Sequence, residues 1–199
     1  MLIGVTGGIG CGKTRVARLL SENLTARYTS SDEICRELLV KDQPGYLQFV
    51  RSFGDRFLDD EKNIDRALLR THIFSDDISR QQLESILHPL VHKRILTESR
   101  KVDVGRPVIA EVPLLFECGW EHDFDGIVCV TASRDTVIER IMARDCVSRT
   151  EAGRIIDVQM DLDEKATRSD WIIDNDGDYD QTRLRLVQVA EMIRGCSEK

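Results

Sequence analysis

The sequence predicts an α/β fold in which helices cover both faces of a five-stranded parallel sheet. Short apolar runs alternate with amphipathic stretches of helical spacing along most of the 199 residues, as parallel strands do when crossover helices join them. The first apolar run ends in a cluster of glycines, the pattern of a buried strand that leads into a ligand-binding loop. Residues 43–100, in contrast, show helical spacing and no convincing strand. We therefore expect one three-layered domain with a helical insertion on the ligand-binding edge of the sheet.

Five apolar runs are the expected strands. They lie at residues 2–5, 28–31, 108–112, 127–130 and 171–173. The second run, Tyr28-Thr29-Ser30-Ser31, is the weakest because it is the most polar. Asp32 follows it directly and begins a helix, so this aspartate is expected at the carboxyl end of a strand. In an open parallel sheet, ligands bind at that edge.

Helical spacing fills the intervals between the strands. Asp65 can cap a helix of the insertion, and further helices are expected at 134–145 and 180–194. His88-Pro89 is expected to interrupt a helix, because proline lacks the donor that a helix interior needs. The expected parts of the domain are a core at about 1–42, 101–139 and 166–199, a helical insertion at about 43–100 and a lid at about 140–165.

Composition and charge narrow the function. Hydrophobic residues make up 41% of the chain and charged residues 32%, which supports a folded core and excludes a disordered chain. The formal net charge of −7 argues against a surface that grips nucleic acid. The six cysteines form no C-x-x-C pair, and no stretch has the pattern of a secretion signal or a membrane span. We expect a cytoplasmic monomer with neither a nucleic-acid nor a membrane partner.

Residues 7–14, GGIGCGKT, match the phosphate-loop pattern G-x-x-x-x-G-K-[ST]. Glycines let the backbone amides converge on phosphate oxygens, and the helix that begins there adds the positive end of its dipole. Lys13 can reach the β- and γ-phosphates, and the Thr14 hydroxyl can ligate Mg²⁺. An ordinary glycine-rich turn is the alternative, but this loop follows a predicted strand and precedes a helix. The expected nucleotide contacts are Gly8, Ile9, Gly10, Cys11, Gly12, Lys13, Thr14 and Arg15.

Cys11 occupies an open position of this loop, where any small residue would serve. A thiolate made acidic by the helix terminus would be open to oxidation, which would block the loop. A small residue that only fills space is the simpler interpretation.

Three classes of phosphate-loop protein compete. A GTPase needs an Asn-Lys-x-Asp motif, which the sequence lacks, and the D-x-x-G match at 174–177 follows the last strand rather than an early one. A regulatory or motor ATPase is usually larger, or uses arginine fingers that cannot be identified in this chain. A small-molecule kinase fits best, because a short chain combines a helical insertion with an arginine-rich segment.

Within that class, the order of the motifs resembles the dephospho-CoA kinase family along nearly the whole chain. The matching segments are residues 3–14, 30–36, 65–74, 83–91, 112–117, 140, 144–145, 159–160 and 172–177. Pro113-Leu114-Leu115-Phe116-Glu117 is the most distinctive of them. The resemblance implies that ATP, with Mg²⁺, phosphorylates the ribose 3′-hydroxyl of dephospho-CoA in the last step of coenzyme A synthesis. A nucleoside or nucleotide kinase on the same scaffold is the alternative.

Two departures from the family pattern concern the surroundings of the site. Ser30 stands where the family has the first aspartate of an Asp-Ala-Asp segment, so any supporting role of that carboxylate is lost or moved. Val137 stands where a glutamine is common. Asp32, which matches the second aspartate, is retained.

The resemblance implies roles for four residues outside the phosphate loop. Asp32 would orient, or deprotonate, the acceptor hydroxyl, and Arg140 would neutralise charge on the transferred phosphoryl group. Asn175 and Gly177 would line the adenine side of the nucleotide. Each has a simpler interpretation, since Asp32 could only cap its helix, Arg140 could be solvated, and residues 175–177 could form a plain turn.

Contacts with the acceptor and the metal are expected elsewhere. Arg66 and Arg70 lie one helical turn apart and could meet substrate phosphates, or form surface salt bridges. Glu111 ends a buried strand, where an acid of the Walker B type approaches Mg²⁺ through water, or pairs with an arginine. The remaining expected substrate contacts are His88, Leu115 and Glu117. A packing or turn role explains His88 equally well, since Pro89 follows it.

Residues 140–165 carry closely spaced charges and few large apolar side chains. Ser148 and Glu151 have the spacing of a capping box that begins a short helix inside this segment. A segment so thinly anchored should open and close on the sheet. We expect nucleotide and dephospho-CoA together to order it, along with residues 43–100.

Overall fold

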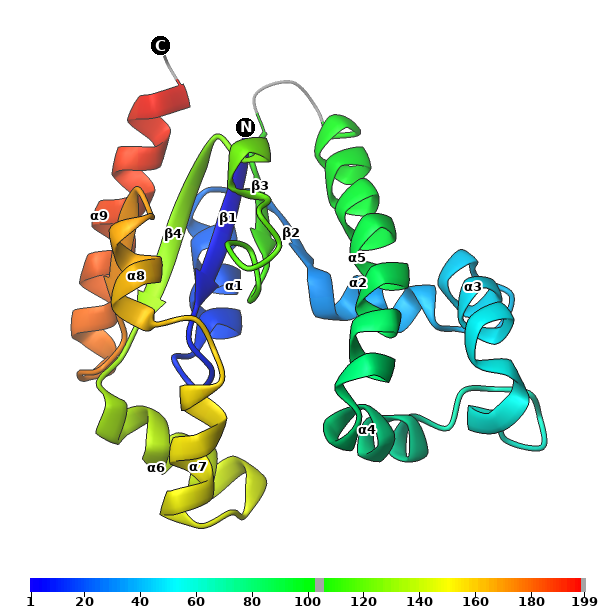
Figure 1. The fold of residues 1–199 in the computed structure, drawn as a ribbon. Helices are drawn as coiled ribbons and strands as arrows, with labels where there is room; N and C mark the ends of the chain where they lie inside the picture. The colour runs from blue at the N-terminus through cyan, green and yellow to red at the C-terminus, as the bar shows by residue number, and fades with distance from the viewer. Residues whose placement is uncertain (103–105, 198–199) are drawn as a thin grey trace. The chain divides into compact units, whose positions relative to one another are not determined.

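A computed structural model describes residues 1–102 and 106–197 (Figure 1). The five strands form one sheet in the order β2-β3-β1-β4-β5. The strands are β1 (Leu2–Gly7), β2 (Arg27–Ser30), β3 (Val108–Glu111), β4 (Gly126–Thr131) and β5 (Trp171–Asp174). β1 pairs in parallel with β3 on one side and β4 on the other, and β4 pairs in parallel with β5. The predicted parallel α/β fold is confirmed.

Helices in contact with the sheet bury its central strands on both faces. They are α1 (Lys13–Asn23), α8 (Leu162–Thr167) and α9 (Tyr179–Ser197), while α6 (Arg134–Asp145) and α7 (Arg149–Asp157) pack against each other. α1 packs on β1 and β3 and against α9, whereas α8 packs on β1 and β4 (Figure 1). β1 is buried along its whole length, which explains why its sequence is an uninterrupted apolar run rather than an alternating one.

The strand that leads to the phosphate loop is packed tightly by the segment after β3. A Cβ atom at Gly4 would lie 2.5 Å from Cδ1 of Leu115, and Leu115 has no exposed surface. Glycine at this position of β1 therefore leaves room for the buried Leu115 side chain, which any larger residue would have to displace.

The chain divides into two compact units. The first comprises Met1–Thr29 and Lys101–Lys199, and the second is Ser30–Arg100. The second unit is helical, with α2 (Ser31–Leu38), α3 (Pro44–Phe53), α4 (Arg66–Ser75), α5 (Asp77–Arg100) and the short 3₁₀ helix η1 (Gly54–Phe57). The sequence placed residues up to 42 with the core, but α2 packs on α3 and α5 and belongs to the helical unit.

The expected interruption at His88-Pro89 is wrong, since α5 runs continuously from Asp77 to Arg100 with Pro89 inside it. Leu83, Leu87 and Val91 are buried at intervals of four residues, so one face of the helix continues into the core past the proline. This packing outweighs the loss of a single backbone hydrogen bond.

The core of the helical unit is built around three phenylalanines. The rings of Phe49 and Phe53 stack with their centroids 4.8 Å apart, and Phe57 packs edge-on against Phe53. Leu83 and Leu87 of α5 belong to the same apolar cluster. Within the described residues, no helix has the length and apolarity that crossing a membrane requires.

We expect Leu87→Ala to lower the free energy of unfolding by about 2–5 kcal/mol, because it opens a cavity in this cluster. Ile78→Ala, in the same helix but with a 78% exposed side chain, should change it by less than about 0.5 kcal/mol. Urea denaturation of both variants checks this. Equal effects would show that α5 does not bury its Leu87 face.

Candidate active site

The phosphate loop joins the end of β1 to the start of α1 in a conformation that only glycines permit. Gly7, Gly10 and Gly12 have φ values of 144°, 75° and 84°. A Cβ atom at Gly7 would lie 2.2 Å from the carbonyl oxygen of Val130, and one at Gly12 would lie 2.3 Å from Nδ2 of Asn175. The loop therefore packs directly against neighbouring backbone and side chains, and these contacts restrict its shape.

Lys13 and Thr14 follow the loop in the first turn of α1. The Lys13 ammonium donates to the carbonyl oxygen of Gly8 at 2.8 Å, so the side chain folds back across the loop. The Thr14 hydroxyl donates to Oε1 of Glu111 at 2.7 Å. The second carboxylate oxygen of Glu111 accepts from the Tyr28 hydroxyl at 2.6 Å.

Glu111 is 5% exposed, and both of its oxygens are hydrogen-bonded by these two hydroxyl groups. Its hydrogen-bond partners are therefore hydroxyls, not the arginine of the alternative interpretation. The Arg18 guanidinium stacks on the Tyr28 ring, 4.6 Å from its centroid. Tyr28 was not predicted as part of the site, because no pattern in the sequence indicates either contact.

The donor set at this position fits Mg²⁺. A hydroxyl and a carboxylate oxygen lie side by side at the phosphate loop, and Mg²⁺ bound to nucleotide phosphates needs only one or two protein oxygens. No group of three or more His, Cys, Asp or Glu side chains that could cage a metal occurs in the described part of the chain. The residues present therefore suit a metal that arrives with the nucleotide.

Arg140 and Asn175 connect three segments at the phosphate loop. The Arg140 guanidinium donates to the carbonyl oxygens of Gly10, at 3.3 Å, and Asn175, at 2.8 Å. The Asn175 amide donates to the carbonyl oxygen of Cys11 at 2.8 Å and accepts from the Thr182 hydroxyl at 3.2 Å. The loop after β5 is thus bound to the phosphate loop directly, and the predicted residues of α6 and of this loop do come together.

Three other arginines in or close to the expected lid are paired with carboxylates. Arg134 pairs with Asp157 at 2.8 Å, Arg144 pairs with Asp145, and Arg149 pairs with Asp135. These three arginines are more than half exposed. Arg140 differs from them because its donors point at the phosphate loop. The capping box at the start of α7 is confirmed, with Ser148 and Glu151 bonded reciprocally.

A pocket of about 550 Å³ lies between the phosphate loop and the expected lid. Gly8 and Ile9 line it on the loop side, and Ser133 and Arg134 line it at the start of α6. Residues 156, 157 and 159–163 line it on the lid side. The backbone N–H of Ile9 donates to Oε1 of Gln159 at 2.9 Å. The lid segment therefore already contacts the loop that would hold the phosphates.

Val137, which departs from the family pattern, packs on the phosphate loop. It is 4% exposed, and its Cγ1 lies 3.1 Å from the place that a Cβ atom at Gly10 would occupy. An apolar side chain here supports the loop by contact rather than by a hydrogen bond.

In the helical unit, Asp32 lies in the first turn of α2 with an exposed side chain. The N-cap of the helix is Ser30, so a capping role does not explain Asp32. Its carboxylate is favoured there by the helix dipole. Asp65 caps α4 through two backbone amides, as predicted.

Arg66 and Arg70 are exposed on α4. Arg66 donates to the carbonyl oxygen of Arg36 at 3.1 Å, and the Arg70 guanidinium lies 5.6 Å from the centroid of Phe74. Neither contact is the surface salt bridge of the alternative interpretation. His88 is half-buried in α5.

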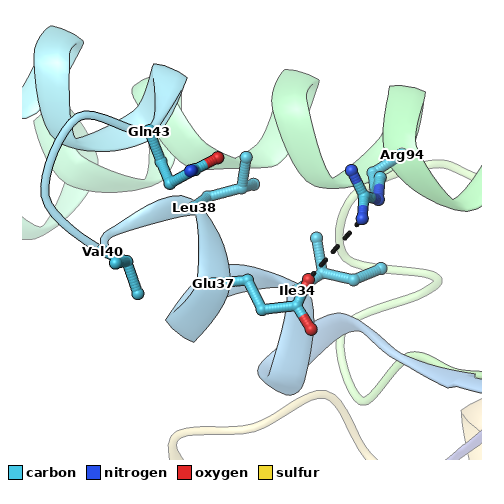
Figure 2. A pocket seen from close by; sticks show the side chains of 6 residues that line it. All are labelled: Ile34, Glu37, Leu38, Val40, Gln43 and Arg94. Carbon is cyan, nitrogen blue, oxygen red and sulfur yellow. Dashed lines mark ion pairs between the residues drawn. The ribbon is translucent and has the colours of Figure 1, made fainter.

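A second pocket, of about 280 Å³, lies within the helical unit between α2 and α5 (Figure 2). Ile34, Glu37 and Leu38 line it from α2, and Arg94 lies across it in an ion pair with Glu37 at 3.7 Å. At 3.6 residues per turn, these three side chains leave α2 roughly half a turn away from Asp32. The pocket therefore does not include the predicted catalytic aspartate.

Leu115 and Glu117, which the resemblance placed at the substrate, follow β3. Leu115 is fully buried against β1, and Glu117 forms an ion pair with Lys165 at 2.7 Å. Lys165 was not predicted as a site residue, because a lysine in a short polar helix gives no sign that it is buried.

The sheet, the phosphate loop, and a lysine and an arginine directed at that loop define a P-loop kinase. A solved protein from Thermus thermophilus is similar in structure, with a TM-score of 0.79 and 30% identity over 97% of both chains. The dephospho-CoA kinase from Campylobacter jejuni has a TM-score of 0.72 and 28% identity, over 98% of this chain and 97% of that one. The shikimate kinase of Aquifex aeolicus shares the fold, with a TM-score of 0.57 and 16% identity, over 99% of this chain and 98% of that one.

The chain belongs to the dephospho-CoA kinase family, whose model matches residues 1–181. The dephospho-CoA kinase of Desulfotalea psychrophila is 37% identical over 188 residues, which is 94% of each chain. That of Geobacter sulfurreducens is 36% identical, over 94% of this chain and 96% of the relative.

We expect Cys11 to resist alkylation in the folded protein. It has no exposed surface, and burial raises the pKa of its thiol despite the opposing charge of Lys13. Burial likewise raises the pKa of Cys129 to about 12. A raised pKa leaves less thiolate, the reactive form, at neutral pH.

Mass spectrometry after brief iodoacetamide treatment at pH ~8 should therefore find label on the exposed Cys146 and Cys196 before Cys11 and Cys129. This result would support the space-filling interpretation of Cys11. Early labelling of Cys11 would support a redox role instead.

We also expect Tyr28→Phe to lower the free energy of unfolding by about 1–3 kcal/mol, because it leaves one oxygen of the buried Glu111 carboxylate without its donor. Chemical denaturation measures the loss. A change below about 0.5 kcal/mol, the usual size for an ordinary surface position, would show that this hydrogen bond is not needed.

Proposed function

We propose that this protein transfers the γ-phosphoryl group of ATP to the ribose 3′-hydroxyl of dephospho-CoA, giving coenzyme A and ADP. The 3′-oxygen forms a bond to the γ-phosphorus, the bond from that phosphorus to the bridging oxygen of ADP breaks, and the hydroxyl proton is released. The observation that carries the proposal is the family match along residues 1–181, combined with a phosphate loop whose glycines pack against neighbouring segments. We further propose that the protein is a cytoplasmic monomer.

On the nucleotide side, the amides of residues 8–15 bind the phosphates, and Lys13 turns from the Gly8 carbonyl to the β- and γ-phosphates. Arg140, already directed at the loop, neutralises charge that spreads over the transferred group. Asn175 and Gly177 border the adenine side. Thr14, and Glu111 through water, would hold Mg²⁺, which supplies further neutralisation of phosphate charge.

On the acceptor side, Asp32 accepts the hydrogen bond of the ribose hydroxyl and aligns its oxygen with the γ-phosphorus. A loose transition state needs alignment more than a strong base, so an exposed carboxylate at a helix N-terminus suffices. Arg66 contacts a carbonyl oxygen and Arg70 contacts an aromatic ring. Neither contact neutralises a guanidinium charge, so both arginines can meet the phosphates of the acceptor. We include His88 among the acceptor contacts.

A panel of acceptors tests the function directly. The protein is incubated with Mg²⁺-ATP and either dephospho-CoA, adenosine or nucleoside monophosphates, and the products are separated by chromatography. Coenzyme A formed from dephospho-CoA alone supports the proposal. Product only from a nucleoside or its monophosphate would assign the protein to the alternative class of nucleoside or nucleotide kinases.

We expect Asp32→Asn to lower turnover by about a hundredfold or more, since alignment of the acceptor hydroxyl is lost. ATP affinity and thermal stability should stay near the values of the unmodified protein, because the side chain is exposed. Glu33→Gln is the matched control, as it removes a neighbouring carboxylate from the same helical turn. Similar kinetics in both variants would contradict the role of Asp32.

Closure of the lid is expected to require both ligands. Hydrogen exchange should slow across residues 140–165 and 43–100 when nucleotide and dephospho-CoA are present together, because a kinase must exclude water from the γ-phosphate. Exchange followed by mass spectrometry compares the free, singly bound and doubly bound protein. Equal protection of residues 140–165 in all states would show that this segment is a fixed wall.

A further inference from the structure

Lys165 is a fully buried lysine that the phosphate chemistry does not use. Its exposed fraction is 0%, and the other buried charged side chain among the described residues is Glu111. Removing an ammonium group from water is costly unless its charge and its donors are both satisfied. A lysine retained in such a place therefore needs a structural explanation.

The Lys165 ammonium binds the segment that follows β3, which we call the post-β3 turn (residues 112–119). Its Nζ donates to the carbonyl oxygen of Pro113 at 2.8 Å and pairs with Oε1 of Glu117 at 2.7 Å. The same Pro113 carbonyl accepts from the hydroxyl of Thr6, at 3.2 Å, in β1. Thr6 directly precedes the first glycine of the phosphate loop. One carbonyl oxygen thus connects α8, the post-β3 turn and the entry to the phosphate loop.

A second cation binds the same region from its rim. Arg168, the residue that ends α8, lies 4.5 Å from the centroid of the Phe116 ring and pairs with Glu121. α8 itself packs on β1 and β4. The turn is therefore bound at Pro113, Phe116 and Glu117 by a single short helix that rests on the sheet.

The stretch that carries these cations also reaches the phosphate loop. Gln159, a few residues before α8, accepts from the backbone N–H of Ile9. In the sheet, β3 lies between β2 and β1, so the post-β3 turn leaves the carboxyl edge next to the strand that feeds the phosphate loop. Ligands of parallel sheets bind at this edge.

We infer that Lys165 is a positioning residue that, with Glu117 as its counter-charge, holds the post-β3 turn in the shape that the acceptor requires. The inference rests on the proposed function. It gives Glu117 a role other than substrate contact, because its carboxylate is bound by Lys165. Lys165 and Glu117 then fix the buried side of the turn, while its exposed side, which includes Leu114 at 37% exposure, remains accessible.

Lys165→Met tests this, since it keeps the apolar stem and removes the charge and the donors. We expect the KM for dephospho-CoA to rise about tenfold or more, while the KM for ATP stays within about twofold. Hydrogen exchange at residues 113–119 should become about tenfold faster. Val189→Ala, a buried change in α9 away from the turn, is the control for general destabilisation and should alter neither quantity.

Glu117→Gln is the second variant. It removes the charge of the carboxylate but keeps a side chain of the same shape, so it tests the positioning role if Lys165→Met does not fold. It should raise the acceptor KM in the same direction by a smaller factor. The double variant should be no worse than Lys165→Met alone, because the two residues act as one pair.

Equal rises in both KM values, or a Val189→Ala variant that behaves like Lys165→Met, would overturn the positioning role in favour of a purely structural one. An unchanged acceptor KM with unchanged exchange would also overturn it. If the unmodified protein does not phosphorylate dephospho-CoA, the proposed function fails. Faster exchange at residues 113–119 in Lys165→Met would then still show that Lys165 holds the turn.

Discussion

The phosphate loop depends on close contacts of Gly7 and Gly12 with neighbouring segments, which leave no room for a Cβ atom at either position. The α-carbon of Gly7 lies against the Val130 carbonyl of β4, and that of Gly12 lies against the Asn175 amide. Because these contacts come from β4 and from the residue that follows β5, the parallel sheet itself sets the loop geometry. Converging amides are the source of phosphate affinity, so the register of β1, β4 and β5 precedes every other feature of the site.

Asn175 and Arg140 follow from that geometry. With no Cβ atom at Gly12, the Asn175 amide can reach the Cys11 carbonyl, and Arg140 then caps the Asn175 carbonyl and reaches Gly10. Each bond satisfies a backbone carbonyl in the phosphate loop or in the loop after β5. The same residues that the family resemblance assigns to ATP are therefore needed first to complete the loop.

The two buried charged side chains among the described residues, Glu111 and Lys165, lie next to β1, and each has hydrogen-bonding partners for its charged group. Glu111 is satisfied by two hydroxyl donors, and Lys165 is satisfied by a carbonyl and a carboxylate. Glu111 links β3 to α1 and β2, and Lys165 links α8 to the post-β3 turn. Such groups are expensive to bury and expensive to disrupt, so they restrict the segments they join more tightly than apolar contacts of the same size would.

The sequence predicted the parts of this fold that local patterns encode. The buried strands appear as apolar runs, the phosphate loop as a spaced set of glycines, and the caps at Asp65 and Ser148 as polar residues before helices. Pro89 was misjudged because helix propensity is local, whereas the packing of Leu87 and Val91 that maintains α5 is tertiary. Tyr28 and Lys165 were missed for a related reason, since their partners lie 83 and 52 residues away.

The distribution of charge explains how an acidic chain can present a site for an acidic ligand. With a formal net charge of −7, the molecule as a whole repels phosphates, and a pair of exposed charges contributes little in water. Arg134, Arg144 and Arg149 are neutralised by neighbouring carboxylates, whereas Arg140 and Lys13 donate to carbonyl oxygens at the loop. A carbonyl is a dipole and not a counter-ion, so the bonds of Arg140 to the carbonyls of Gly10 and Asn175 leave its charge available at the phosphate loop. The positive potential is therefore concentrated where the loop amides converge, and the acidic surroundings disfavour phosphates elsewhere.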